Sequence, residues 1–379
     1  MEFTITEMDR RLHTVRTRMQ AADVDCLMVT GVENFCYFAG VPVALYQERR
    51  PWCALIPLER EPVAFTMEGT HVTLERQGYF RDVQAYSLPV SPNLTTRIEG
   101  SLKRLRVKRL ACELGLDQRL GMPVKDFEAI RAALPEVQFV DGAGIIWSMR
   151  MFKSPEEVER MKRACEITGA TRQVLFKEIR QGMTETDVAA IWARLMFEAG
   201  AERPAFIFVN SGGPPDFLPK HERILRRGDT LWVDGGVYVH GYTCDFSRVA
   251  TLGEASPRQR QLHRDAVEVM ACVLEAIGPG VKVARLSEIC AREMTRRGYS
   301  GFGNNATVVA GHGMGMITNE PPLIASWDET VLSDGLVTGI ELGPIADEGM
   351  FIWEDLVQVK PTGYELLTTE TSDLIEIDF

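Results

Sequence analysis

Two carboxylates in an apolar stretch constrain this chain more than any other feature. Asp234 and Asp245 stand eleven positions apart in a segment that is otherwise rich in Val, Leu, Trp, Tyr and Gly. Residues 231–233 and 237–239 are strand formers separated by Gly235 and Gly236, so we expect a hairpin, broken at the glycines, to bring both acids onto one face. Buried charge is costly unless it is paired or binds a metal, and a cation should therefore lie between the two acids.

The composition predicts a soluble, folded protein of two or three domains, with 379 residues of which 45% are hydrophobic. The formal net charge of -11 argues against nucleic acid as a partner, because phosphate binding requires clustered Lys and Arg. The basic run 103–109 alternates charged with apolar residues, which favours a solvated helix end or edge strand over a nucleic-acid patch.

The cysteines and the amino terminus predict a cytoplasmic location. Eight cysteines are spread along the chain without a C-x-x-C pair, so we interpret them as reduced packing residues. The first residues lack a basic region followed by an apolar core, and no stretch approaches about 18 apolar residues. We therefore expect no contact with a membrane.

The chain divides into two predicted domains, 1–150 and 153–379, with Lys153 at the boundary. The first alternates a helix near 9–21 with strand-like runs at 26–30, 52–57 and 62–66, which is typical of an α/β domain. The second opens at Ser154-Pro-Glu-Glu157, where Ser caps a helix and Glu sits three residues later.

The second domain has the pattern of an α+β fold with two similar halves. Another helix should begin at Thr184 and end at Gly200, and two more should span 256–278 and 286–297. Strand-like segments follow at 307–310, 336–341 and 351–359. Two helices and a hairpin are thus followed by two helices and strands, which suggests that the halves surround one site.

Three further residues of the second domain are suited to chemistry. His312 lies between glycines that allow close backbone approach, although a structural histidine would look the same. Glu341 ends an apolar run, and Glu354 lies in a strand on the face of Ile352 and Leu356. Charged residues in such strands need a partner. Asp355 should point the other way and serve as a structural acid.

Together these four carboxylates and one imidazole are a ligand set for two divalent ions. Such a centre lowers the pKa of bound water, polarises a carbonyl and supports hydrolysis. The alternative interpretation is that each acid simply pairs with Arg or Lys within the fold.

The order of these motifs resembles the M24 metallopeptidase family, the pita-bread enzymes, which include Xaa-Pro aminopeptidases, prolidases and creatinases. The motifs are Asp234-Gly-Gly236, Asp245-Phe-Ser-Arg248, Gly311-His-Gly-Met-Gly315, Thr338-Gly-Ile-Glu341 and Trp353-Glu-Asp355. Residues 32–40 are similar to the creatinase/prolidase amino-terminal domain. The resemblance implies an α/β creatinase-like domain followed by an α+β pita-bread domain.

The resemblance also implies roles for the site residues. Asp245 and Glu354 would bridge two metal ions and Asp234 would bind one of them. His312 and Glu341 would bind the other, and Glu341 would shuttle protons for a bridging hydroxide. The ions would be manganese, cobalt, zinc or iron.

The chain departs from the family pattern at three substrate-facing positions. Phe217 stands where a Pro-His pair is usual, and His221 is the nearest histidine. Asn319 replaces a second histidine, and an amide can donate to an oxyanion but cannot carry a proton. Ile352 replaces a basic residue two positions before the last glutamate. These changes suggest a working metal centre with an altered substrate, or variation within a peptidase subgroup.

Substrate contacts from the first domain would come from three residues, Tyr46, Arg49 and Arg50. Members of the family reach from this region into the partner's site across a homodimer, and Arg binds a carboxylate in bidentate fashion. A solvated loop is the alternative interpretation.

The leading hypothesis is a dinuclear metallohydrolase that acts as an Xaa-Pro dipeptidase or aminopeptidase on a small peptide or amide. The alternative is a non-peptidase relative, namely a dimethylsulfoniopropionate lyase, an ectoine hydrolase or a creatinase-like amidinohydrolase. A non-catalytic binding module ranks last, because such modules typically lose metal ligands and all five are present here.

Overall fold

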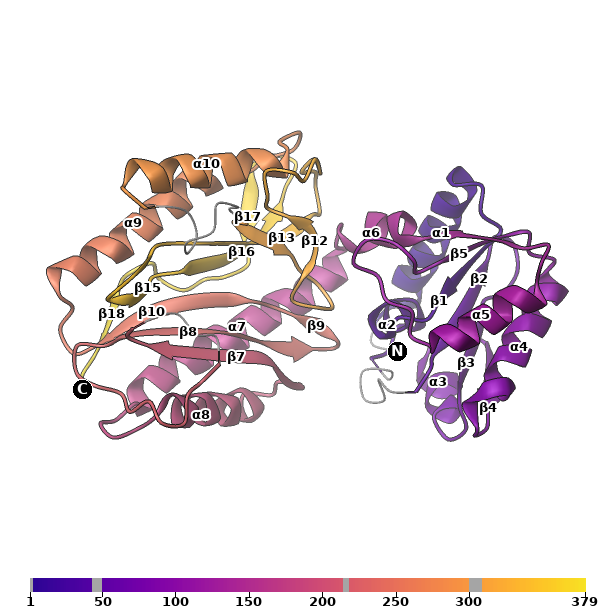
Figure 1. The fold of residues 1–379 in the computed structure, drawn as a ribbon, viewed down its shortest axis with the longest axis horizontal. Coiled ribbons are helices and arrows are strands. Elements are labelled where there is room, and N and C mark those ends of the chain that lie inside the picture. Colours follow the sequence, from indigo (N-terminus) through magenta and orange to yellow (C-terminus); the bar gives the residue numbers. More distant parts are fainter. Residues whose placement is uncertain (1–2, 43–49, 214–217, 300–308) are drawn as a thin grey trace. The chain divides into compact units, whose positions relative to one another are not determined.

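The computed structural model describes residues 3–42, 50–213, 218–299 and 309–379. They form two compact units, Met1–Arg150 and Met151–Phe379 (Figure 1).

The N-terminal unit is built on one mixed sheet with strand order β4-β3-β2-β1-β5-β6. β1 pairs antiparallel with β2 and parallel with β5. The strands are β1 Cys26–Val29, β2 Cys53–Pro57, β3 Val63–Met67, β4 Asp82–Tyr86, β5 Arg109–Cys112 and β6 Gln138–Asp141. The helices are α1 Ile5–Ala21, α2 Val32–Ala39, α3 His71–Gln77, α4 Val90–Leu105, α5 Val124–Ala133 and α6 Ala143–Arg150.

Helices α4 and α5 cover one face of this sheet. Ile98 of α4 and Phe127 of α5 join Cys26, Met28 and Leu110 of the strands in one buried cluster. The basic run 103–109 lies where α4 ends and β5 begins, with Arg106 as the helix C-cap. The predicted helix end is therefore confirmed.

The C-terminal unit places two sheets between pairs of helices (Figure 1). One sheet has the order β18-β10-β8-β7 with β9 beside β8, and the other has the order β12-β11-β13-β16-β17. The first-half elements are α7 Pro155–Glu178, α8 Glu185–Glu198, β7 Arg203–Ser211, β8 Thr230–Val239, β9 Tyr242–Thr243 and β10 Phe246–Leu252. The second-half elements are α9 Pro257–Leu274, α10 Val283–Arg296, β11 Gly311–Gly313, β12 Glu320–Leu323, β13 Val337–Leu342, β14 Ile345–Ala346, β15 Gly349–Met350, β16 Trp353–Val359, β17 Tyr364–Leu366 and β18 Ile375–Ile377.

Three of the four helices begin as their capping residues predict. Ser154, Thr184 and Ser256 each form a complete capping box with the residue three positions later. In the predicted strand at 307–310, residues 307 and 308 lie outside the described part of the chain. The strand that the structure shows there begins only at Gly311.

The hairpin between Asp234 and Asp245 exists, but the prediction of a break at the two glycines is wrong. β8 runs unbroken from Thr230 to Val239, and the chain reverses at His240 and Gly241, which have φ of 49° and 76°. Two residues at positive φ are typical of a tight hairpin turn. Gly236 serves close packing instead, since a Cβ there would lie 1.8 Å from the carbonyl oxygen of Cys244.

Replacing Gly236 with Ala is expected to destabilise the C-terminal unit by roughly 2 kcal/mol or more, because the methyl group meets backbone that cannot move aside. Chemical denaturation measures the loss. Gly278→Ala is the control, since a Cβ at that position meets nothing within 4 Å. Equal stability of the two variants would contradict the packing role of Gly236.

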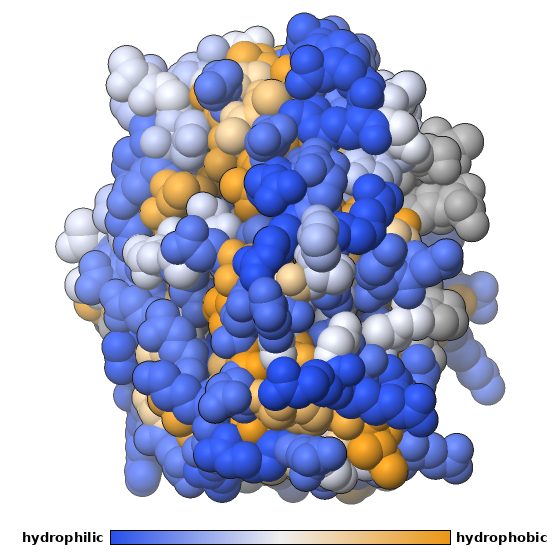
Figure 2. Space-filling model, turned by 90° about the vertical axis from the view of Figure 1, so that its left-hand side faces the viewer, coloured by the Kyte–Doolittle hydropathy of each residue, from blue (hydrophilic) through white to orange (hydrophobic). Residues whose placement is uncertain are grey.

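One face of the C-terminal unit is mainly hydrophilic, with apolar residues in a narrow, interrupted band (Figure 2). Scattered apolar exposure of this kind is normal for a folded domain. Among the described residues, no helix combines the length and apolar character needed to span a membrane.

Candidate metal centre

The first half of the site comes from neighbouring strands of one sheet. Asp234 lies in β8 and Asp245 directly precedes β10, and each is only 5% exposed. β8 and β10 pair antiparallel with Asp234 opposite Ser247. Asp245 lies two residues before Ser247, so alternation along the strand places both acids on the same face.

The second half comes from three adjacent strands of the other sheet. Glu341 of β13 pairs directly with Glu354 of β16, and His312 of β11 pairs with Gly339 of β13. A Cβ at Gly339 would lie 2.9 Å from Oε1 of Glu354. The glycine therefore leaves room for the Glu354 carboxylate beside His312.

The two halves converge. Three ligand atoms, one each from Asp245, His312 and Glu354, lie within 4.8 Å of one another. Nε2 of His312 is 3.8 Å from Oδ2 of Asp245, and Nδ1 is 3.1 Å from the carbonyl oxygen of Gly313. A proton on Nδ1 would donate to that carbonyl, which leaves the lone pair of Nε2 directed at the acids.

The carboxylates fit a cation. Oδ1 of Asp234, Oδ1 of Asp245 and both oxygens of Glu354 are buried, and they have no hydrogen-bond partner among the described residues. Buried polar atoms are normally paired, and unpaired carboxylate oxygens beside an imidazole form a donor set for divalent metal ions. The residues present therefore suit the metal that the sequence predicted.

The electrostatics of the metal-free site agree with this fit. Burial and the neighbouring carboxylates raise the pKa values of Asp245 and Glu354 well above their usual range. Burial raises the pKa of Asp234 to about 6, and burial together with Asp234 raises that of Glu341 to about 8. Burial lowers the pKa of His312, which keeps its imidazole neutral. Glu341 is the partly exposed member of the group.

The metal-free chain is expected to lose stability as the pH rises from about 4 to about 8. Asp234 and Glu341 have folded pKa values of about 6 and about 8, above their ordinary values of 3.8 and 4.5, so the folded state holds protons that the unfolded chain releases. Denaturation of metal-free protein across this range measures the effect. A stability that rises with pH in the same window would contradict it.

Asp355 points away from the cluster, as predicted for a structural acid. Its Oδ1 accepts from Nη2 of Arg248 at 2.7 Å and from Oγ1 of Thr368 at 2.7 Å, and its Oδ2 accepts from Nε1 of Trp353 at 2.8 Å. Arg248 also donates to the carbonyl oxygen of Glu354 at 2.6 Å. The strand that carries Glu354 is thus fixed from its opposite face.

Among the other predicted site residues that the structure describes, three are exposed and one is buried. His221 is exposed before β8, and its charge acts on Asp187 at the start of α8. Asn319 is exposed directly before β12, and Arg50 is exposed before β2. Ile352 is fully buried in an apolar cluster with Trp232 and Phe351. Tyr46, Arg49 and Phe217 lie outside the described residues.

Two buried ion pairs of the C-terminal unit are not among the site residues predicted from the sequence. Arg172 of α7 lies on the same buried helix face as Cys165 and Thr168. Its helical spacing from these two residues therefore indicates, from sequence alone, that its charge is buried. Its partner Glu370 lies in a polar C-terminal segment, where nothing in the sequence distinguishes it from an exposed acid. Lys153 and Glu320 form another buried pair, with Nζ 3.6 Å from Oε2.

Comparisons with known proteins agree with the fold and the cluster. The model of metallopeptidase family M24 matches residues 159–361, and that of the creatinase/prolidase N-terminal domain matches residues 11–152. An Xaa-Pro dipeptidase of Pyrococcus horikoshii is 30% identical and aligned over 97% of this chain and 99% of its own length. One of Pyrococcus furiosus is 31% identical over 69% of this chain and 75% of its own.

Solved structures show the same fold. The prolidase of Pyrococcus horikoshii superposes with a TM-score of 0.83 at 24% identity, covering 97% of this chain and 100% of that structure. The Xaa-Pro dipeptidase of Bacillus anthracis gives a TM-score of 0.85 at 22% identity, with coverage of 97% and 99%.

The fold is that of a creatinase-type N-terminal domain followed by a pita-bread hydrolase domain. The chain belongs to metallopeptidase family M24.

Proposed function

We propose that this protein is a dinuclear metal-dependent peptidase that cleaves Xaa-Pro dipeptides or short peptides with an Xaa-Pro bond. The observation that carries the proposal is the convergence of buried, unpartnered carboxylate oxygens from Asp245 and Glu354 on neutral His312, with the buried carboxylate of Asp234 beside that of Asp245. Ion pairing within the fold is the competing interpretation, but it does not account for oxygens that lack partners among the described residues.

Each residue has a proposed role. Asp234 would hold one divalent ion, His312 and Glu341 the other, and Asp245 and Glu354 would contact both. When bound, the ions would activate a water molecule and polarise the peptide carbonyl. Glu341 would also transfer protons to and from the water molecule held between the ions, because its carboxylate would lie beside that water. Asn319 is accessible and would donate a hydrogen bond to the developing oxyanion.

The Xaa-Pro specificity is supported by the relatives at 30% and 31% identity, which are named Xaa-Pro dipeptidases. The carboxylate-rich donor set suits manganese or cobalt, and zinc or iron fits the imidazole equally well. We also propose a homodimer, in which Tyr46, Arg49 and Arg50 contact the substrate of the partner's site. A cytoplasmic location is supported by the eight cysteines, all of which are unpaired thiols in the structure.

A panel of small substrates tests the proposal. Protein loaded with Mn²⁺ or Co²⁺ is incubated with Ala-Pro, Leu-Pro and Ala-Ala, with creatine, and with dimethylsulfoniopropionate. Release of proline from the first two substrates, with little cleavage of Ala-Ala, supports an Xaa-Pro peptidase. Turnover of creatine or release of acrylate, without release of proline, would identify a non-peptidase member of the family instead.

A further inference from the structure

Two buried guanidinium groups lie behind the strands that carry Asp245 and Glu354. The side chains of Arg172 and Arg248 are 0% and 2% exposed. Nη1 of Arg172 donates to the carbonyl oxygen of Phe246 at 2.8 Å, one residue after Asp245. Nη1 of Arg248 donates to the carbonyl oxygens of Ser247 at 2.9 Å and Glu354 at 2.6 Å. The two arginines therefore hold the backbone of both strands.

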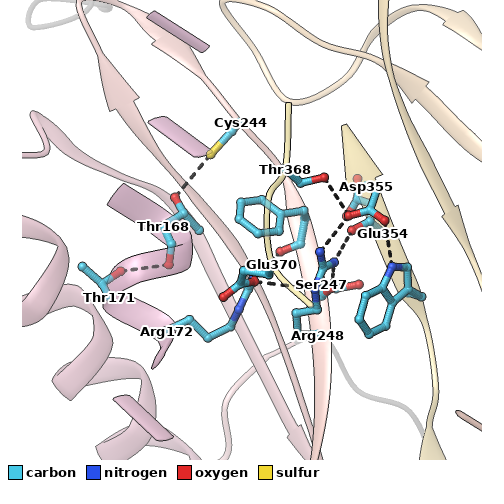
Figure 3. A network of polar contacts seen from close by, with 12 residues as sticks. Thr168, Thr171, Arg172, Cys244, Ser247, Arg248, Glu354, Asp355, Thr368 and Glu370 are labelled. Carbon is cyan, nitrogen blue, oxygen red and sulfur yellow. Dashed lines mark hydrogen bonds and ion pairs between the residues drawn. The ribbon is translucent and has the colours of Figure 1, made fainter. Parts of the chain in front are cut away.

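Glu370 lies between the two arginines (Figure 3). Its Oε2 accepts a hydrogen bond from Nη2 of Arg172, and the same oxygen is 3.5 Å from Nε of Arg248. The side chain of Glu370 is 9% exposed. One carboxylate oxygen thus contacts both cations, whereas Asp355 forms an ion pair with Arg248.

This charge arrangement depends on Glu370. Burying two neighbouring cations is costly unless anions compensate them. The ring of Phe246 lies 4.3 Å from the guanidinium carbon of Arg172 and 5.3 Å from that of Arg248, and these contacts contribute a weaker attraction. Burial lowers the pKa of Arg172, Glu370 opposes this shift, and repulsion from Arg248 adds to it.

The segment that carries Glu370 is anchored on both sides of it. Thr368 donates to Asp355 at 2.7 Å, and Nε2 of His263 lies 2.8 Å from the carbonyl oxygen of Ser372. β18 then pairs parallel with β10. On α7, a Cβ at Gly169 would lie 3.3 Å from Cγ of Glu370, so the helix leaves space for the side chain. Glu370 is therefore held at a fixed place between α7 and the two sheets.

We propose that Glu370 is a positioning residue for the metal centre. By compensating Arg172 and Arg248 together, it fixes the backbone at residues 246–247 and 354 and thereby the separation of the Asp245 and Glu354 carboxylates. This inference rests on the proposed function, because it assumes that those carboxylates hold metal. It assigns to the C-terminal segment a part in building the site.

The test compares Co²⁺ binding by the wild-type protein and by Glu370→Gln, using calorimetry and the visible absorption of bound cobalt. Loss of an outer partner of a metal ligand typically weakens metal affinity by about 10- to 100-fold, and we expect a loss in this range with an altered cobalt spectrum. Glu370→Asp keeps the charge but is one methylene shorter, so it should bind cobalt with intermediate affinity.

Glu376→Gln is the matched control. It removes a carboxylate from the same C-terminal segment, but that carboxylate pairs with Arg260 and not with Arg172 or Arg248. It should bind cobalt as the wild type does. Folded Glu370→Gln with wild-type affinity and spectrum would overturn the inference. If Glu370→Gln does not fold, Glu370→Asp decides in the same way, since unchanged cobalt binding would contradict a positioning role. A wild-type protein that binds no cobalt would overturn the proposed function and this inference with it.

Discussion

Replacing Glu354 with Gln is expected to abolish metal binding and to lower the rate of Xaa-Pro hydrolysis by at least about a hundredfold. Removing a residue that only hydrogen-bonds to a metal ligand already lowers metal affinity or activity by up to about a hundredfold, and Glu354 would be a ligand itself. The same change should stabilise the metal-free protein at pH 8. The Glu354 carboxylate is 1% exposed, lies near Glu341 and Asp234, and has a pKa well above its usual range. Replacing this buried acid with an uncharged amide removes the cost of keeping it in the fold, so the expected change is a gain in stability.

The two effects have opposite signs, which separates a metal ligand from a structural acid. Denaturation with and without Mn²⁺ measures the stability, and calorimetry measures the metal. Two results would contradict the account. One is a metal-free Glu354→Gln variant that is less stable than the metal-free wild type, and the other is a variant that still binds stoichiometric metal.

Replacing Asp355 with Asn should have the reverse effect on stability, although the two residues are neighbours in β16. Asp355 accepts three hydrogen bonds and pairs with Arg248, whose side chain is 2% exposed. Breaking a buried ion pair by removing one partner costs about 3 kcal/mol or more. Arg248 would keep only Glu370, whose Oε2 lies 3.5 Å from its Nε and which also pairs with Arg172. We therefore expect a large loss of stability with metal present and without it.

Chemical denaturation measures this loss against a surface control. Glu329 pairs with Lys282, and their side chains are 71% and 56% exposed, so Glu329→Gln should change stability by less than about 1 kcal/mol. If Asp355→Asn were as mild as this control, the buried network behind Glu354 would not stabilise the fold.

The proposed metal ligands can be recognised in the sequence because each lies in a short, distinctive pattern. An acid such as Asp234 or Glu354 within a run of strand-forming residues is conspicuous whatever the fold. The capping residues Ser154, Thr184 and Ser256 likewise act within three positions of sequence. The position of the turn is not predictable locally, because adjacent glycines such as Gly235 and Gly236 are typical of chain reversals. In the fold, Gly236 instead packs against the Cys244 carbonyl, between β9 and β10.

Long-range pairing was not predictable in this way. Arg172 and Glu370 are 198 positions apart in sequence, and only the packed fold shows that they meet. The burial of Ile352 similarly depends on the apolar cluster around Trp232, to which residues from both halves of the unit contribute. Ile352 in place of a basic residue marks a difference from the family pattern, but the sequence alone does not show that this side chain is buried among apolar residues.

The most direct test of the central claim is a titration of metal-free protein with Mn²⁺ while the hydrolysis of Ala-Pro is followed. The account predicts no hydrolysis without metal and a rate that reaches its plateau at two equivalents of Mn²⁺ per chain. Undiminished hydrolysis of Ala-Pro by rigorously metal-free protein would contradict it.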